Sequence, residues 1–146
     1  MQKPKLHKQE KSYSCSIACL KMVLEYWGIQ ESELQLRKKA KTKFYGTHPV
    51  NLIECARLYG LDAFLASLNL ADLERLINQG IPTIANILKT KKEDFYIHSV
   101  VVYAIDENYV FFLDPEDGDI QLARDLFERL WQNNDSIAVV INMRSD

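Results

Sequence analysis

The first half of the chain carries apolar residues three and four positions apart, the spacing of one buried face of an α-helix. Serine or proline before these stretches and glycine after them are typical helix boundaries. Ser12 or Ser14 is expected to cap the first helix, and Gly28 is expected to end it. The pattern predicts four helices, over residues 15–27, 32–40, 49–60 and 71–80.

The second half carries short, nearly continuous apolar runs rich in β-branched residues, which are typical of buried strands. "HSVVVYAI" (98–105) and "YVFFL" (109–113) are separated by three residues, so we expect them to form a hairpin. Pro115 and Gly118 then mark a turn at "DPEDGD". The remaining pattern predicts strands at 81–88 and 136–143 and a helix at 123–131.

Helices packed on a mainly antiparallel sheet make an α+β fold. A chain of 146 residues is long enough to bury a core as one domain. We therefore expect a single domain over 1–146, with a helical part over about 12–80 and a sheet part over about 81–146.

Charge adds little evidence for a partner. The formal net charge of −2 gives no reason to expect nucleic acid. Its distribution is uneven, because residues 1–43 hold ten Lys or Arg and four Asp or Glu, whereas residues 106–146 hold three and ten. This predicts solvated faces of opposite sign.

The sequence also bears on location. The polar amino terminus, "MQKPKLHKQEK", lacks the apolar core of a secretory signal, and no apolar run approaches the roughly 18 residues of a membrane helix. Three cysteines form no disulfide framework. These features indicate reduced thiols and a cytoplasmic location.

Cys15 has an unusual position among the three cysteines, because it stands where the first helix begins. A helix amino terminus carries roughly half a positive charge, which favours the thiolate that acts as a nucleophile. Cys19 lies one turn deeper and should point into the core, and Cys55 lies mid-helix among apolar residues. Cys15 is therefore the candidate nucleophile.

A thiolate nucleophile needs a base, and His98 is the best placed of the three histidines. It heads the most apolar strand, where a polar ring needs a partner, whereas His7 is expected on the solvated surface and His48 at a helix cap or exposed. Asp114 lies at the same end of the hairpin as His98, within reach of its ring. This arrangement is typical of a nucleophile–base–carboxylate triad. Simpler structural roles stay open for both residues. His98 could be a core histidine that hydrogen-bonds to the backbone, and Asp114 could cap the turn that follows it.

Acyl transfer by a thiolate also needs donors for the oxyanion that forms. The backbone N–H of Cys15 is one candidate. Gln9, six residues upstream, offers a side-chain amide as a second. A surface role for Gln9 is the simpler interpretation of a glutamine in a Lys- and Glu-rich segment.

Together these residues resemble the bacteriocin-processing, double-glycine leader peptidases. Members of this family are papain-like cysteine peptidases, found as amino-terminal domains of peptide-exporting ABC transporters and as stand-alone proteins. The resemblance lies in the Gln9–Cys15 spacing, in a histidine heading a valine-rich strand, and in an Asp-Pro pair sixteen residues after that histidine. The helical middle and "LFERLW" also match, so the resemblance covers nearly the whole chain.

The resemblance implies a papain-like fold in which Cys15 is the nucleophile and His98 the general base and acid. Asp114 would orient His98, and Gln9 would serve the oxyanion hole. It implies no cofactor and no metal. The implied substrate is the leader of a small secreted peptide, cut after two small residues, and the implied second partner is an ABC transporter membrane domain at the inner face of the membrane.

The sequence departs from the family beside the nucleophile. Family members usually carry an acidic residue and a glycine there, as in "DCG", whereas this chain has Ser14 and Ser16. Ser14 can still cap the helix, and Ser16 adds a side chain where the substrate backbone would pass. Both are therefore expected to border the substrate and to change its selection.

Three other interpretations stay open. A catalytically weak or inactive relative would bind a leader peptide or partner without cutting it. A second possibility is another thiol acyl-transfer reaction on the same scaffold, such as amide hydrolysis, deamidation or transamidation. A metal site at Cys15, Cys19 and His98 is disfavoured, because structural zinc usually needs a second close pair of ligands.

Overall fold

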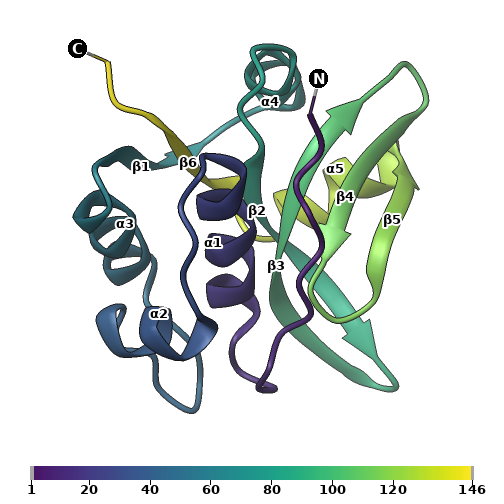
Figure 1. Ribbon diagram of the computed structural model, residues 1–146. Coiled ribbons are helices and arrows are strands. Elements are labelled where there is room, and N and C mark those ends of the chain that lie inside the picture. Colours follow the sequence, from purple (N-terminus) through teal and green to yellow (C-terminus); the bar gives the residue numbers. More distant parts are fainter. Residues whose placement is uncertain (1, 146) are drawn as a thin grey trace.

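The computed structural model describes residues 2–145. The helices are α1 (Cys15–Tyr26), α2 (Glu33–Lys39), α3 (Pro49–Leu58), α4 (Leu70–Asn78) and α5 (Arg124–Gln132). The strands are β1 (Leu61–Ser67), β2 (Thr83–Lys91), β3 (Asp94–Ile105), β4 (Tyr109–Asp114), β5 (Gly118–Ala123) and β6 (Ile137–Met143). Figure 1 shows that α1, α2 and α3 come first in the chain and that β2, β3, β4 and β5 follow one another in its second half.

The six strands form one sheet in the order β1-β6-β2-β3-β4-β5, and every neighbouring pair is antiparallel. The β3–β4 register pairs Val101 with Leu113 and Val102 with Phe112. Asp114 therefore ends β4 close to the point where His98 stands on β3, as the hairpin predicted.

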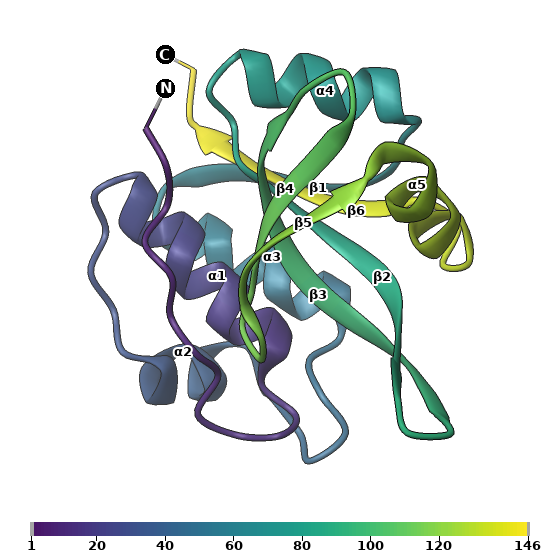
Figure 2. The same cartoon turned by 90° about the vertical axis from the view of Figure 1, so that its right-hand side faces the viewer.

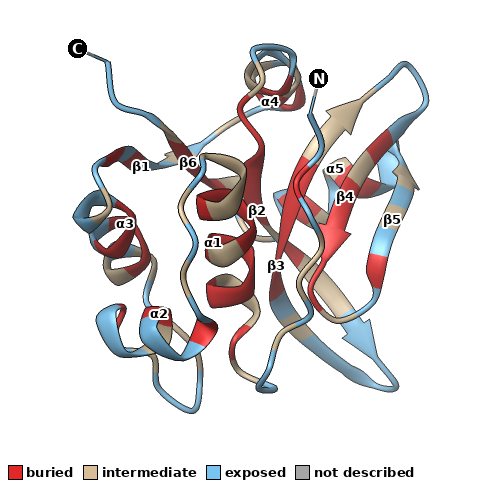
Figure 3. Ribbon diagram, viewed as in Figure 1, coloured by how far each residue is buried: buried red, intermediate tan, exposed pale blue. Residues whose placement is uncertain are grey.

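Helices cover both faces of the sheet. α1, α2 and α3 lie on one side, and α4 and α5 lie on the other (Figure 2). Each side has its own apolar core: one joins α1 and α3 to the sheet, and the other joins α4 and α5 to it. α1 and the middle strands are the most buried elements, as Figure 3 shows. Burial of this kind, at about 25 cal/mol per Å² of apolar surface, is the main force holding the layers together.

Local sequence explains most helix boundaries. Pro49 occupies the first turn of α3, and the His48 ring nitrogen Nδ1 accepts the N–H of Val50. Asn69 and Asp72 form a reciprocal capping box at α4. Gly28 follows α1 with a φ of +88°, a left-handed conformation that glycine adopts without strain.

The α+β fold class is confirmed, and so are the predicted helices and the β3–β4 hairpin. The expected boundary near residue 80 is wrong in one respect, because β1 lies inside the supposed helical part and completes one edge of the sheet. β5, the opposite edge, was not predicted either. In β1 buried and exposed positions follow each other irregularly, and in β5 apolar residues are interspersed with polar ones. Neither strand therefore has the continuous apolar run that is typical of a central strand.

The basic amino-terminal segment pairs with the acidic carboxy-terminal third. Lys3 forms an ion pair with Asp119, and the Lys8 ammonium donates to the backbone carbonyl of Glu116 at 2.8 Å. These basic groups are exposed, as expected of solvated faces, but they also contact groups of the acidic segment. The chain brings the two charged ends of the sequence together, next to the β4–β5 turn.

Candidate active site

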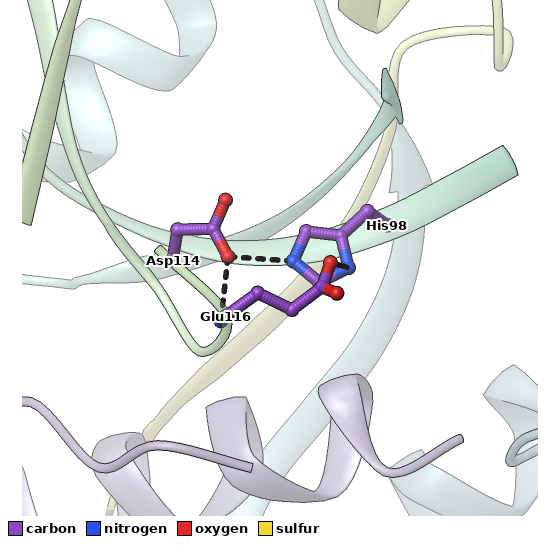
Figure 4. A group of neighbouring side chains, drawn as sticks. All are labelled: His98, Asp114 and Glu116. Carbon is purple, nitrogen blue, oxygen red and sulfur yellow. Dashed lines mark hydrogen bonds and ion pairs between the residues drawn. The ribbon is translucent and has the colours of Figure 1, made fainter. Parts of the chain in front are cut away.

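Three elements meet at the candidate site. Cys15 is the first residue of α1, His98 lies on β3, and Asp114 is the last residue of β4. The His98 Nε2 atom lies 2.7 Å from Asp114 Oδ1 (Figure 4). A carboxylate can only accept, so Nε2–H donates and the Nδ1 nitrogen is left for other partners.

Asp114 performs both of the roles that its sequence position suggested. Besides accepting from His98, its Oδ1 atom accepts the backbone N–H of Glu116 at 2.8 Å and that of Asp117 at 3.3 Å. Its Oδ2 atom contacts the Lys89 ammonium at 2.8 Å. The carboxylate therefore caps the turn and holds the imidazole, and Lys89 pairs with its remaining oxygen.

The surroundings of Cys15 favour a thiolate. Burial raises the pKa of this thiol, but hydrogen bonding to His98, the charge on His98 and hydrogen bonds from Ser99 outweigh it, so that the net pKa lies below the ordinary value. His98 therefore interacts both with the Asp114 carboxylate, through Nε2, and with the Cys15 thiol. The arrangement can form a thiolate–imidazolium pair.

His98 and Asp114 are tuned in opposite directions. Burial lowers the pKa of His98, but its hydrogen bonds and charge interactions with Asp114 and Cys15 raise it to about 9. Burial raises the pKa of Asp114, and the His98 and Lys89 contacts reverse this and hold the pKa well below the usual range of a carboxyl group. Both side chains are buried, so water screens their interaction little.

Gln9 lies on the same side of the molecule, because its backbone N–H donates to the Pro115 carbonyl at 3.0 Å. Its side-chain amide donates to the carbonyls of Lys11 (2.8 Å) and Ser12 (3.3 Å), in the loop that leads to Cys15. The amide oxygen is buried and finds no hydrogen-bond partner among residues 2–145. Service in an oxyanion hole therefore requires Nε2 to leave one of these carbonyls, and that role stays a prediction.

The two serines beside Cys15 have different surroundings. Ser14 is fully buried, and its hydroxyl bonds the backbone N–H and carbonyl of Lys11, both at 3.0 Å. It is the N-cap residue of α1, as one of the two expected candidates, but its side chain makes no cap hydrogen bond. Ser16 lines a cleft beside the thiol.

This cleft, of about 280 Å³, runs from the thiol between the loop before α3 and the β2–β3 hairpin. Tyr45, Gly46 and Thr47 form one side of its lining, and Asn86, Ile97 and Ser99 form another. The hydroxyl of Ser99 donates to the Asn86 side-chain oxygen at 2.7 Å. Sequence reasoning did not single out these residues. Ser99 adjoins His98 in the sequence, and this adjacency was the only signal for it.

The remaining cysteines and histidines have structural roles. Cys19 and Cys55 are fully buried, as expected, and burial raises the pKa of both thiols. His48 caps α3, as expected. The expectation for His7 is wrong: its Nε2 atom lies 2.7 Å from Glu25 Oε2, and both side chains are partly buried.

One cluster within residues 2–145 has the composition of a metal site: His98, Asp114 and Glu116 offer ligand atoms within 4.8 Å of one another. The Lys89 ammonium contacts both carboxylates, at 2.8 and 3.2 Å. It supplies the positive charge that a cation would otherwise bring. The cluster is therefore explained by an internal ion-pair network.

Across the part of the chain that the structure describes, no helix is both long and apolar enough to cross a membrane.

Comparison with known proteins agrees with this geometry. Residues 3–145 match the model of the Peptidase C39 family. The peptidase domain of Streptococcus ComA, a bifunctional ABC transporter, has a TM-score of 0.83 and 23% identity, covering 97% of this chain and 100% of that one. A double-glycine-motif protease from an AMS/PCAT transporter, solved with its leader peptide, has a TM-score of 0.81 at 23% identity, covering 97% and 93%.

Relatives in sequence fall into two groups. An uncharacterised protein of Methanothermobacter thermautotrophicus is 32% identical over 86% of this chain and 82% of its own length. The pediocin PA-1 transport/processing ATP-binding protein PedD of Pediococcus acidilactici is 29% identical over 87% of this chain. The match spans only 17% of the length of PedD.

Proposed function

Because the chain belongs to the peptidase C39 family and is a cysteine peptidase, we propose that it cuts leader peptides after a double-glycine-type site. The observation that carries the proposal is the contact of one buried imidazole with a carboxylate at 2.7 Å and with a thiol whose pKa is lowered. The names of two relatives support the substrate class, since one is solved with a leader peptide and another processes pediocin PA-1.

The proposed reaction begins with attack of the Cys15 thiolate on the carbonyl carbon of the second small residue. The oxyanion that forms is stabilised by the backbone N–H of Cys15 at the start of α1, and by Gln9 once its amide turns. The His98 imidazolium then gives its Nδ1 proton to the leaving amine, so that the C–N bond breaks and a thioester remains.

In the second half, neutral His98 takes a proton from water, and the hydroxide attacks the thioester carbonyl. The C–S bond breaks, the carboxylic acid leaves as the new leader end, and the thiolate–imidazolium pair is restored. Asp114 holds the ring in one orientation and stabilises its charge throughout.

The proposed partners follow from the substrate. The first is the leader of a small secreted peptide, whose two small residues would pass the cleft beside Ser16. Ser14, expected from the sequence to border the substrate as well, is fully buried and does not line this cleft. The second is an ABC transporter membrane domain, since PedD combines transport and processing. A location in the cytoplasm, at the inner face of the membrane, remains a prediction.

The test is mass spectrometry of Gly-Gly leader peptides incubated with the wild-type chain and with Cys15→Ala. The wild type should release the leader cut after the second glycine, and Cys15→Ala should fold normally and release none. His98→Ala should lose nearly as much activity, and Asp114→Ala less. Cys55→Ala, which changes a buried thiol outside the site, is the matched control and should still cut. Cleavage by Cys15→Ala, or no cleavage of any leader by the wild type, would contradict the proposal.

A further inference from the structure

Glu116 lies two residues beyond Asp114, in the turn between β4 and β5, and its side chain reaches back to the imidazole (Figure 4). Its Oε1 atom lies 3.4 Å from His98 Nδ1. This is the ring nitrogen that Asp114 leaves free. A second carboxylate is therefore in contact with the imidazole, at the nitrogen that Asp114 does not bind.

The Glu116 carboxylate is fixed in place. The Tyr96 hydroxyl donates to Oε1 at 2.8 Å, and the Lys89 ammonium donates to the same atom at 3.2 Å. Its backbone is held as well, through its N–H to Asp114 and its carbonyl to Lys8. A carboxylate with this many partners keeps its position relative to the ring.

The polar and charged groups around His98 and its carboxylates come from four elements and one turn. Cys15 approaches from α1, Asp114 from the end of β4 and Glu116 from the turn. The Tyr96 ring packs edge-on against the imidazole from β3 itself, with 5.8 Å between centroids. Lys89, on β2, contacts Asp114 and Glu116 and also Asp117 at 2.7 Å. One ammonium therefore balances three carboxylates, and a net negative charge is left beside the ring.

We propose that Glu116 is a positioning residue for the catalytic histidine: its carboxylate, 3.4 Å from Nδ1, holds His98 as the imidazolium and fixes the orientation of the ring. The proposal rests on the proposed function, because it assigns Glu116 a role in that same site. Lys89 and Tyr96 keep the Glu116 carboxylate from closing completely on the ring, so the Nδ1 proton stays available to the leaving amine. Glu116 itself is not among the residues that line the cleft.

The proposal predicts the direction in which the pKa of His98 should change when Glu116 is substituted. A negative charge next to His98 raises its pKa. Asp114 and Cys15 raise the pKa of His98 to about 9, and the charge of His98 in turn helps to lower the pKa of Glu116. Loss of the Glu116 charge should therefore lower the pKa of His98. The alkaline limb of the pH profile, where the imidazolium loses its proton, should move to lower pH.

The experiment compares the pH dependence of kcat/KM for wild type, Glu116→Gln and Glu116→Asp on one leader peptide. Glu116→Gln keeps an acceptor for Tyr96 but loses the charge, so its alkaline limb should fall by about one pH unit with KM little changed. Glu116→Asp keeps the negative charge, so its alkaline limb should lie close to that of the wild type. Asp117→Asn, the matched control, removes a charge that contacts Lys89 but not the ring, and should move the limb much less.

A second readout does not depend on cleavage. In the Cys15→Ala background the thiolate is absent, and NMR titration of the His98 ring should show the same downward shift of its pKa on Glu116→Gln. An unchanged alkaline limb and an unchanged ring titration would overturn the role of Glu116 while leaving leader cleavage intact. If the wild type cuts no leader, the proposed function fails, and the ring titration still decides whether Glu116 controls the charge of His98.

Discussion

At the scale of single residues, the three cysteines share one chemistry and differ only in their surroundings. The pKa of Cys15 lies below its ordinary value because of His98 and Ser99, whereas burial raises the pKa of Cys19 and Cys55. Since the thiolate is the reactive form, Cys15 should be alkylated by iodoacetamide at pH 7 at least about ten times faster than either. Peptide mapping by mass spectrometry over a time course measures all three rates in one sample.

The control for this prediction removes the cause of the shift. His98→Ala should slow alkylation of Cys15 near neutral pH, because the hydrogen bond and the positive charge that lower its pKa are gone. The rates at the two buried cysteines should not change. Equal reactivity of all three thiols in the wild type would show that Cys15 is a structural cysteine.

Some residues of the candidate site could be predicted from the sequence, and others could not. Cys15, His98 and Asp114 could be predicted because a helix start and a two-strand hairpin set their positions within a short range of residues. Lys89 and Glu116 could not, since their roles depend on the β2–β3 register and on where a side chain in a turn points. Those features are fixed by tertiary contacts that leave no periodic signal.

At the scale of elements, α2 holds the segment that carries Gln9. Glu33, the first residue of α2, is buried, and its two carboxylate oxygens accept the backbone N–H of Glu10 at 3.1 and 3.3 Å. Burial raises the pKa of this carboxyl, and contact with Arg37 at 3.4 Å opposes the rise. A helix outside the proposed triad therefore anchors the loop that leads to Cys15.

We predict that Glu33→Ala destabilises the fold by about 1 to 3 kcal/mol, because it leaves the Glu10 N–H without its buried acceptor. It should also lower kcat for leader cleavage, since the Gln9 segment loses its anchor. Denaturant unfolding and steady-state kinetics measure the two effects. Glu33→Gln retains an acceptor oxygen and should recover most of both; if it behaves like Glu33→Ala, the anchoring explanation is wrong.

At the scale of the whole molecule, the sheet is buried from both sides, and this decides what sequence patterns can reveal. The central strands give apolar runs because helices cover both of their faces, so β2, β3, β4 and β6 were predictable. The edge strands β1 and β5 have fewer neighbours and tolerate polar residues. The same two-sided packing makes α1 buried along most of its length, which is why its apolar stripe is broader than one helix face.

The His98–Asp114 pair should make the stability of the whole fold depend on pH. The pKa of His98 rises to about 9 on folding from about 6.5 in the unfolded chain, so its contribution is complete below about pH 6.5 and is lost as pH rises toward 9. The pKa of Asp114 is lowered, so its contribution is present above about pH 4 and is lost in acid. Their interaction therefore stabilises the fold most between about pH 4 and pH 6.5.

We predict that His98→Ala costs about 1 to 3 kcal/mol more unfolding free energy at pH 6 than at pH 9.5, measured by urea denaturation at both values. Asn69→Ala is the control, because it removes the α4 capping box through an amide that has no proton to lose. Its cost, about 1 kcal/mol, should be the same at both values. If the cost of His98→Ala is also the same, the imidazolium does not contribute to folding, and the charge that the pair carries would have to arise only when substrate binds.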